Sequence, residues 1–364
     1  MIGIRADGNS QIGMGHIMRC LTIAESLREN GEQVVFFLAT GECRGMVYDR
    51  GFDCHILETD FANMEDELPV LCAMMDKLVI DKLLIDSYYV TDAYLEFLRK
   101  QVLTIYLDDV DRFPYPVDLL INYNVFAKAT DYPYGKEYDA CGLNSLQKEN
   151  GTLLLTGPVY APVRKEFKQN SAAIKDTVKD ILISMGGSDL FNLSQKIANE
   201  LLEKTSATLH LVCGPFNLYK TELYALAEKE KRVIIHENVK DMWNLMQCCD
   251  MAVSAAGSTL CELAVSGVPM VIFSFVDNQK RIAQEFGRRD AAVTIGHYSA
   301  DRENEFLMML SAKVQTLCND RSKRENLVCN AGNLVDGQGA ERIAKVIIKW
   351  NKNNCFNKKQ TNIQ

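Results

Sequence analysis

The residue types best suited to chemistry stand together near the N-terminus, in the segment Ile12-Gly13-Met14-Gly15-His16-Ile17-Met18-Arg19-Cys20. An apolar run, Ile2–Ala6, precedes this segment, and apolar residues with helical spacing follow it from Ile17 to Leu27. The pattern predicts a strand, a glycine loop and a helix, a combination that binds phosphate groups in many α/β proteins. We therefore expect this loop, with Gly13 and Gly15, to handle an anionic substrate.

The loop does not match the common nucleotide motifs. A dinucleotide fingerprint beginning at Gly13 would need a glycine where Met18 stands, and the chain has no G-K-[ST] P-loop here. His16 stands beside the second glycine instead, and an imidazole accepts a proton from water near neutral pH. His16 is therefore a candidate general base, and Asp7, at the end of the preceding strand, is the candidate to orient it. The alternative is that His16 only hydrogen-bonds the substrate.

Strands and helices that would position these residues alternate along the chain. The apolar runs predict strands at Ile2–Ala6, Gln33–Leu38, Lys82–Asp86, Leu103–Leu107, Asp118–Ile121, Asp180–Met185, Thr208–Cys213, Arg232–His236, Met251–Ser254 and Pro269–Phe275. The periodic runs predict helices at Gly15–Asn30, Met64–Lys77, Asp92–Gln101, Asn192–Lys204, Thr221–Lys229, Lys240–Cys248, Ser258–Val265, Gln279–Arg288, Glu305–Leu317 and Ala340–Trp350. Such alternation is typical of parallel sheets with helical crossovers.

The chain of 364 residues is long enough for two domains. We expect two Rossmann-like α/β domains that face a cleft, at residues 1–160 and 178–350, with a helix-like polar connector at 164–179 and a polar tail at 351–364. A glycine loop follows the first strand of the second domain, Gly186-Gly187-Ser188, and another, Gly257-Ser258-Thr259, precedes a helix. Ser258 is either an N-cap or part of a diphosphate site, and a tight turn is an alternative reason for the paired glycines.

Composition excludes several classes of protein. The net charge of −8 argues against a nucleic-acid partner, because phosphate neutralisation needs a basic face. The 12 cysteines are scattered without a C-x-x-C pair, which favours a reduced cytoplasm over secretion. No window offers the ~20 apolar residues of a membrane span, and the N-terminus does not read as a signal peptide. We expect a cytoplasmic monomer without membrane insertion.

Several separated motifs in the same order resemble one family, the UDP-sugar hydrolases of pseudaminic acid biosynthesis. The resemblance extends over nearly the whole chain, and Ser87 and the C-terminal tail depart from it. The motifs are Arg5-Ala6-Asp7, Gln11-Ile12-Gly13, Gly15-His16, Arg19, Leu84-Ile85-Asp86-Ser87-Tyr88, Leu107-Asp108-Asp109, Asn122-Tyr123-Asn124, Ala127-Lys128-Ala129, Met185-Gly186-Gly187-Ser188-Asp189, His236-Glu237-Asn238-Val239 and Asn278-Gln279.

The resemblance implies a GT-B-like architecture, similar to that of the glycosyltransferase that adds N-acetylglucosamine to lipid-linked muramyl-pentapeptide. It implies hydrolysis of UDP-2,4-diacetamido-2,4,6-trideoxy-β-L-altropyranose at the anomeric carbon, with the sugar on the N-terminal domain and UDP on the C-terminal one. By the same resemblance, Gly257 and Ser258 would hold phosphate, Glu262 the ribose hydroxyls and Val239 the uracil. Since no glycosyl-enzyme intermediate is needed, we expect C–O cleavage with inversion.

Further polar residues are candidates for the acetamido sugar, since amides and a phenol read N-acetyl groups without adding charge. They are Tyr88, Asn122, Asn124, Asn278 and Gln279, with Gly186, Gly187 and Ser188 lining the same site. Asn278 is equally a candidate N-cap. The carboxylates Asp108, Asp109 and Asp111 suggest either a cation site or, as we expect, a solvated loop.

We expect no cofactor and no metal, since the chain has no H-x-x-H motif and no clustered cysteines. His236 is expected in the nucleotide pocket or at a strand end, and His55, His210 and His297 are expected to serve structure or face solvent. The alternatives to the hydrolase are a GT-B glycosyltransferase using a UDP-sugar, a nucleotide-sugar sensor without catalysis, and an epimerase of the UDP-N-acetylglucosamine type. Fold alone does not separate them.

Overall fold

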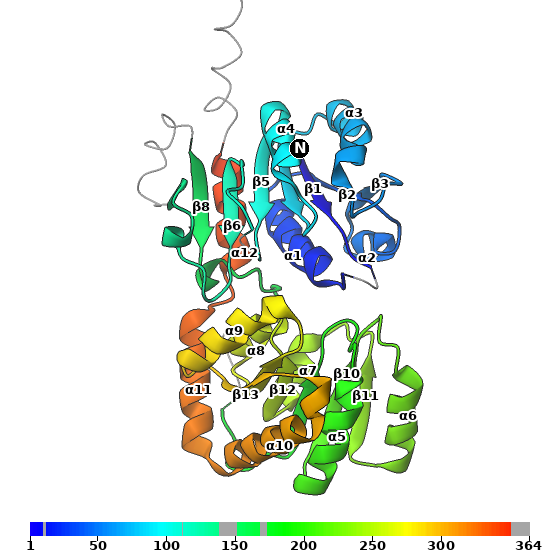
Figure 1. The fold of residues 1–364 in the computed structure, drawn as a ribbon, viewed down its shortest axis with the longest axis vertical. Coiled ribbons are helices and arrows are strands. Elements are labelled where there is room, and N and C mark those ends of the chain that lie inside the picture. Colours follow the sequence, from blue (N-terminus) through cyan, green and yellow to red (C-terminus); the bar gives the residue numbers. More distant parts are fainter. Residues whose placement is uncertain (10–11, 111, 138–150, 168–172, 351–364) are drawn as a thin grey trace, which may run out of the picture. The chain divides into compact units, whose positions relative to one another are not determined.

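The computed structural model describes residues 1–364 except 10–11, 111, 138–150, 168–172 and 351–364. The chain forms two compact units (Figure 1). Unit 1 combines Met1–Pro162 with the chain from Gln338 onward, and unit 2 is Val163–Gly337.

Unit 1 is built on a parallel sheet with strand order β3-β2-β1-β4-β5-β6-β8-β7 among its described residues. The strands β1 and β4, which are neighbours in the interior of this order, have every residue buried. The strand bounds are β1 Ile2–Ala6, β2 Val34–Leu38, β3 Asp53–Ile56, β4 Lys82–Asp86, β5 Leu103–Leu107, β6 Leu119–Asn122, β7 Gly135–Glu137 and β8 Thr152–Thr156.

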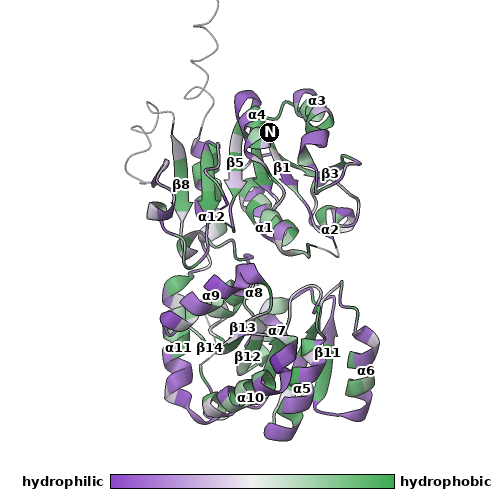
Figure 2. Cartoon of the chain, in the orientation of Figure 1, coloured by the Kyte–Doolittle hydropathy of each residue, from purple (hydrophilic) through white to green (hydrophobic). Residues whose placement is uncertain are grey.

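Helices cover the sheet of unit 1, with their apolar residues toward it and polar residues outward (Figure 2). The helix bounds are α1 Gly15–Glu29, α2 Arg44–Asp49, α3 Leu68–Leu78, α4 Asp92–Gln101 and α12 Gly339–Lys349, with 3-10 turns at Met64–Glu67, Ala129–Asp131 and Pro158–Tyr160. Pro69 stands in the first turn of α3, where its missing N–H costs no hydrogen bond.

Unit 2 holds a second parallel sheet with strand order β11-β10-β9-β12-β13-β14. Its strands are β9 Asp180–Ser184, β10 Thr208–Cys213, β11 Val233–Glu237, β12 Met251–Ala255, β13 Met270–Ser274 and β14 Val293–His297. Its helices are α5 Leu193–Lys204, α6 Lys220–Lys229, α7 Met242–Cys248, α8 Thr259–Ser266, α9 Asp277–Arg288, α10 Glu303–Asn319 and α11 Arg321–Leu334, with a 3-10 turn at Ala300–Arg302.

Each sheet has a point where the strand order reverses direction. In unit 1 it lies between β1 and β4, and in unit 2 between β9 and β12. The loops that leave two such strands diverge to opposite faces, so a crevice opens at their carboxyl ends, where α/β proteins bind ligands. The loops at these points contain His16 and Tyr88 in unit 1, and Gly186 and Gly257 in unit 2.

Two predictions about the segments between and after the domains were wrong. We expected a helix-like connector at 164–179, but the described parts of this segment, 164–167 and 173–179, contain no helix. We expected residues 178–350 to form one domain, but α12 belongs to unit 1, where it packs on α1 and Lys82 Nζ donates to the carbonyl of Ile347 at 2.8 Å. The predicted tail, 351–364, lies outside the described residues.

Candidate functional site

The glycine loop of unit 1 brings His16 to the end of β1. Gly13 adopts a left-handed φ of 77°, which favours glycine, and its N–H donates to the carbonyl of Asn9 at 2.8 Å. The loop then turns into α1 at Gly15, so His16 stands in the first turn of that helix. Because β1 is hydrogen-bonded to β4, this turn lies beside the carboxyl end of β4, where Asp86 stands.

His16 and Asp86 form a buried pair. The imidazole Nδ1 lies 2.5 Å from Asp86 Oδ1, and both side chains are almost fully buried. Because a carboxylate oxygen only accepts hydrogen bonds, the shorter contact, with Asp86, assigns the hydrogen to Nδ1 and the lone pair to Nε2; Arg19 Nη2 also lies 3.1 Å from Nδ1. No described residue hydrogen-bonds to Nε2. This arrangement leaves Nε2 able to accept a proton from a substrate or a water molecule.

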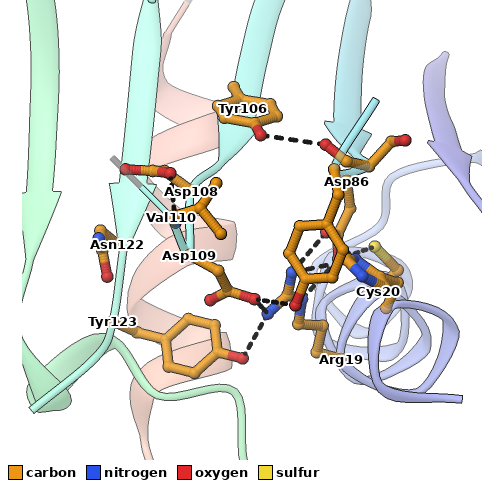
Figure 3. A network of polar contacts seen from close by, with 12 residues as sticks. Arg19, Cys20, Asp86, Tyr106, Asp108, Asp109, Val110, Asn122 and Tyr123 are labelled. Atoms are coloured by element: carbon orange, nitrogen blue, oxygen red, sulfur yellow. Dashed lines mark hydrogen bonds and ion pairs between the residues drawn. The ribbon is translucent and has the colours of Figure 1, made fainter. Parts of the chain in front are cut away.

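Arg19, one turn further along α1, connects this pair to a second carboxylate (Figure 3). Its Nε and Nη2 donate to the two oxygens of Asp86, each at 2.5 Å, and its Nη1 donates to Asp109 at 2.5 Å and to the Tyr123 hydroxyl at 2.9 Å. Burial by itself would raise the pKa of Asp86, but Arg19 and His16 hold that pKa well below its usual range. Asp86 is therefore a fixed anion behind His16.

Three of the predicted sugar-binding residues join the same network. The Tyr88 hydroxyl donates to Asp109 at 3.2 Å, and its ring packs edge-on against the His16 ring, with the centroids 4.4 Å apart. Asn124 donates to the other oxygen of Asp109 at 3.1 Å and to Asn122 Oδ1 at 3.0 Å. Residues from three separate motifs therefore meet in one hydrogen-bond network near His16, at the carboxyl ends of β4, β5 and β6.

The prediction of a solvated carboxylate loop was wrong for Asp108. This residue is 1% exposed and accepts hydrogen bonds from the hydroxyls of Tyr115 at 3.0 Å and Tyr132 at 2.6 Å. Asp109 is also part of the network around Arg19, and Asp111 lies outside the described residues. The two described carboxylates order the loop after β5 rather than face solvent.

Asp7 has a different partner from the one we predicted. Its carboxylate accepts from the backbone N–H of Ala39 at 3.0 Å and pairs with Arg5 at 2.6 Å. Arg5 is fully buried and also binds Glu67 through two hydrogen bonds of 2.7 Å. The buried guanidinium of Arg5 thus compensates the negative charge of the Asp7 carboxylate. The carboxylate that contacts His16 is that of Asp86.

The first glycine loop of unit 2 is shaped by its backbone. Gly186 has a left-handed φ of 80°, and the Gly187 carbonyl accepts from the N–H of Phe216 at 3.0 Å. A Cβ on Gly214 would lie 2.4 Å from that carbonyl, so the two loops pack backbone to backbone. The tight-turn explanation therefore accounts for Gly186. Ser188 follows in the same loop, half-buried.

The helix after this loop begins with its own anionic cap. Asp189 accepts from the backbone N–H of Leu193 at 2.7 Å through one oxygen and from that of Ser194 at 3.0 Å through the other. The first turn of α5 is thereby satisfied and already faces a negative charge. A phosphate group is disfavoured at this helix.

The start of α8 differs, because its N-cap residue, Ser258, is exposed and makes no capping hydrogen bond through its side chain. The N-cap explanation of Ser258 therefore does not hold. Glu262, one turn along α8, binds Arg164 Nε through Oε1 at 2.7 Å. Burial raises the pKa of Glu262, and Arg164 opposes that rise. The N–H groups of Leu260 and Cys261 donate to the carbonyls of Gly257 and Ser258, each at 3.1 Å, so the start of α8 has backbone partners but no side-chain cap.

The remaining predicted residues lie in the loop after β11 and at the start of α9. Val239 is half-buried and follows Asn238, which has a left-handed φ of 51°. Asn278 lies inside α9, whose N-cap is Val276, so the N-cap alternative for Asn278 was wrong. Gln279 Oε1 accepts from the N–H of Phe275 at 3.1 Å, which closes the turn into α9.

Comparisons with known proteins agree with this architecture. Residues 181–347 match the model of the glycosyltransferase family 28 C-terminal domain. A UDP-2,4-diacetamido-2,4,6-trideoxy-beta-L-altropyranose hydrolase of Campylobacter jejuni is 28% identical over 294 residues, which cover 77% of this chain and 93% of the relative. An uncharacterized protein of Methanocaldococcus jannaschii is 27% identical over 325 residues, which cover 84% of this chain but 61% of the relative.

Among solved structures, the crystal structure of Acinetobacter baumannii MurG matches with a TM-score of 0.60 at 15% identity, covering 96% of this chain and 100% of MurG. This likeness confirms the GT-B fold class that we expected, with two Rossmann-like parallel-sheet units. The cleft between the two units stays a prediction. In the part of the chain that the structure describes, no helix has the length and apolar character to cross a membrane.

Sequence reasoning from the residues assigned no role to Asp86 or Arg19 and placed Arg164, with Glu166, only in the connector between the domains. Asp86 and Arg19 both stood in the motifs of the family resemblance, which was the available signal. No sequence signal pointed to the contact of Arg164 with Glu262, because Glu262 lies 98 residues further along the chain.

Proposed function

We propose that this chain is a nucleotide-sugar hydrolase that cleaves a UDP-linked diacetamido-trideoxy sugar, of the UDP-2,4-diacetamido-2,4,6-trideoxy-β-L-altrose type, to UDP and the free sugar. The observation that carries the proposal is the buried His16–Asp86 pair, which leaves the imidazole Nε2 without a partner among the described residues. The related hydrolase of Campylobacter jejuni supports the choice of substrate.

In the proposed step, His16 Nε2 takes a proton from a water molecule while the water oxygen attacks the anomeric carbon. The bond from this carbon to the diphosphate oxygen breaks, and its electron pair leaves with UDP. Asp86 stabilises the imidazolium that forms, because its charge is held by Arg19 and is present throughout the physiological pH range. Attack opposite the leaving group inverts the anomeric centre, and His16 then returns its proton to solvent.

The charge around His16 favours the sugar end of the substrate. Asp86 and Asp109 both pair with the guanidinium of Arg19, so two carboxylates share one positive charge beside His16. This excess of carboxylates repels a diphosphate but favours the positive charge that develops at an anomeric carbon as its bond breaks. We therefore assign unit 1, with Tyr88, Asn122 and Asn124, to the sugar rather than to an anion.

Unit 2 supplies the nucleotide site in this proposal. The start of α8 at Gly257 and Ser258, where no side chain caps the helix, binds the diphosphate, and Val239 contacts the uracil. Glu262 accepts the ribose hydroxyls through Oε2, since Arg164 donates to Oε1 and opposes the loss of its charge. Gly186, Gly187, Ser188, Asn278 and Gln279 line the remaining part of the proposed site.

The test is UDP release from UDP-2,4-diacetamido-2,4,6-trideoxy-β-L-altrose in ¹⁸O-water without any acceptor. We expect the label in the free sugar and none in UDP. Replacement of His16 by alanine is expected to lower turnover at least ~100-fold while UDP still binds. Label in UDP would show attack at phosphorus and would refute the role of His16.

The match of residues 181–347 to a glycosyltransferase domain supports a second candidate, transfer of the sugar to an acceptor. The same experiment separates the two, because a transferase releases little UDP until an acceptor is added. The expected monomeric state and cytoplasmic location stay predictions.

A further inference from the structure

A carboxylate and two imidazoles lie in a diagonal row across three neighbouring strands of unit 2. In the sheet register, His210 on β10 lies beside Leu182 on β9 and beside Ile234 on β11. Asp180 stands two residues before Leu182 on β9. His236 stands two residues after Ile234 on β11. Residues two apart share one face of a strand, so all three side chains lie on the same face. Leu209 and Leu211 point to the opposite face, into the core.

The three side chains form a chain of contacts. Asp180 Oδ1 lies 3.0 Å from His210 Nε2, and His210 Nδ1 lies 3.0 Å from His236 Nε2. Since the carboxylate only accepts, His210 carries its hydrogen on Nε2, and its Nδ1 holds a lone pair directed at His236. The two rings are inclined by 20° with centroids 5.2 Å apart, and His210 Nδ1 and His236 Nε2 face each other.

We infer that His210 Nδ1 and His236 Nε2 are adjacent ligands of a site for a divalent cation of the Ni²⁺ or Cu²⁺ class. Two imidazole nitrogens at ~2.0–2.1 Å from one ion are ~2.9 Å apart at a right angle and ~3.3 Å apart in a tetrahedron. The observed 3.0 Å is closer to the right angle, which square-planar and octahedral ions prefer. On binding, each ring turns its lone pair toward the ion.

The protons on His236 can rearrange at neutral pH so that the ring binds the ion without a change in its charge. Without metal, the His236 Nε2 hydrogen lies between the two rings. When the ion binds, this proton leaves to solvent and Nδ1 of the same ring takes one up, so His236 stays neutral.

Asp180 provides the outer support that such sites have. Histidines that bind metals commonly donate their second N–H to a carboxylate, which fixes the ring and strengthens the ligand. The Asp180 and His210 side chains are 31% and 12% exposed, so an ion and its water molecules can reach the pair. No group of three or more His, Cys, Asp or Glu residues that could hold a metal occurs among the described residues, so water completes the coordination.

Calorimetric titration of the full chain with NiCl₂, without a histidine tag and without substrate, tests the site. We expect one Ni²⁺ per chain, lost in His236→Gln and in His210→Gln. Asp180→Asn, which removes no metal ligand, is expected to weaken binding ~10–100-fold. His297→Gln is the matched control, since this strand histidine contacts Ser274 in another part of the sheet, and it is expected to bind Ni²⁺ like the unchanged chain.

Unchanged Ni²⁺ binding in His236→Gln, or no binding by the unchanged chain at millimolar Ni²⁺, would overturn the inference. Circular dichroism checks that each variant is folded. NMR of the unchanged chain provides a measurement that needs no variant, because Ni²⁺ must perturb the imidazole signals of His210 and His236 before those of His55 and His297. If other histidines respond first, the site is refuted. Neither readout depends on the proposed hydrolysis.

Discussion

Asp86 accepts more hydrogen bonds than a solvent-facing carboxylate could keep in place. His16 and Arg19 donate to it, and Cys20 Sγ adds a weak contact at 3.5 Å. An acceptor held from several directions fixes the imidazole tautomer, which is what a general base needs from its neighbour. The buried pair therefore predicts that His16 and Asp86 act as a unit.

Asp86→Asn is expected to lower kcat by ~10²–10⁴-fold, because an amide no longer fixes the Nδ1–H tautomer or stabilises the imidazolium. Steady-state kinetics of UDP release measures the loss. Asp7→Asn is the matched control and is expected to change kcat less than about threefold, since Asp7 pairs with Arg5 and not with His16. An equal loss in both variants would contradict the assignment of Asp86.

Asp86 also predicts a pH dependence of stability. Its pKa is lowered in the folded chain, against the effect of burial, so the unfolded state binds the proton more tightly. The stabilisation is complete above the ordinary aspartate range, near ~3.9, and is lost as pH falls through and below that range. Urea unfolding between pH 3 and pH 7 is expected to show a steeper decline for the unchanged chain than for Asp86→Asn, and parallel declines would refute the prediction.

Glu262→Ala is expected to weaken inhibition by UDP about 10–100-fold, the range for losing hydrogen bonds to a charged acceptor, with kcat at saturating substrate nearly unchanged. Glu166→Ala provides the comparison, because Glu166 also contacts Arg164, at 3.3 Å, but is not on α8. Product inhibition by UDP measures both. Unchanged inhibition by UDP in Glu262→Ala would show that Glu262 does not bind the ribose.

The sequence made His16 the candidate base but did not identify the carboxylate that contacts it. Asp7 was expected because it follows the first strand, whereas Asp86 lies 70 residues from His16 and meets it only because β1 and β4 are neighbours in the sheet. Strand order is a tertiary property that hydrophobic runs do not encode. The resemblance to a family supplied the motif around Asp86 without stating its contact.

At the level of elements, the buried strands were predicted well and the edges poorly. Apolar runs marked β1, β4 and β5 with the bounds that the structure has, because these strands are buried on both faces. The edge strands β3, β7 and β14 were missed, since each contains exposed residues and at most one buried residue. Strand β8 was also missed, although all of its residues are buried. Helix α11 was missed because most of its residues are polar and few are buried.

The cap of α5 makes an element-scale prediction. Asp189→Ala is expected to lower the free energy of unfolding by about 1–2 kcal/mol, because two backbone N–H groups lose their acceptor and alanine must adopt a left-handed φ of 49°. Asp189→Asn keeps an acceptor oxygen and tolerates this backbone, so it is expected to cost less. Chemical denaturation compares the two variants, and an equal cost would refute the capping role.

On the scale of the whole molecule, the last helix, α12, shows that the apolar periodicity of a helix does not predict which domain the helix packs against. Its apolar face predicted α12 as an amphipathic helix, but such a face does not tell which of two similar sheets it covers. In the structure, α12 returns to unit 1, where Arg342 donates to the Val159 carbonyl at 2.8 Å. A Cβ on Gly339 would lie 2.2 Å from the Ala161 carbonyl, so only glycine fits at this crossing.

The assignment of α12 to unit 1 is tested by a cavity variant read through hydrogen exchange. Ile343 is fully buried on α12, and Ile343→Ala is expected to cost about 2–5 kcal/mol of stability. If α12 completes unit 1, amide protection falls in β1, β4 and α1 and is retained in β9 and β12. Leu310→Ala on α10, equally buried but in unit 2, is expected to give the opposite pattern. If Ile343→Ala instead lowers amide protection in β9 and β12, α12 belongs to the second domain, as the sequence analysis expected.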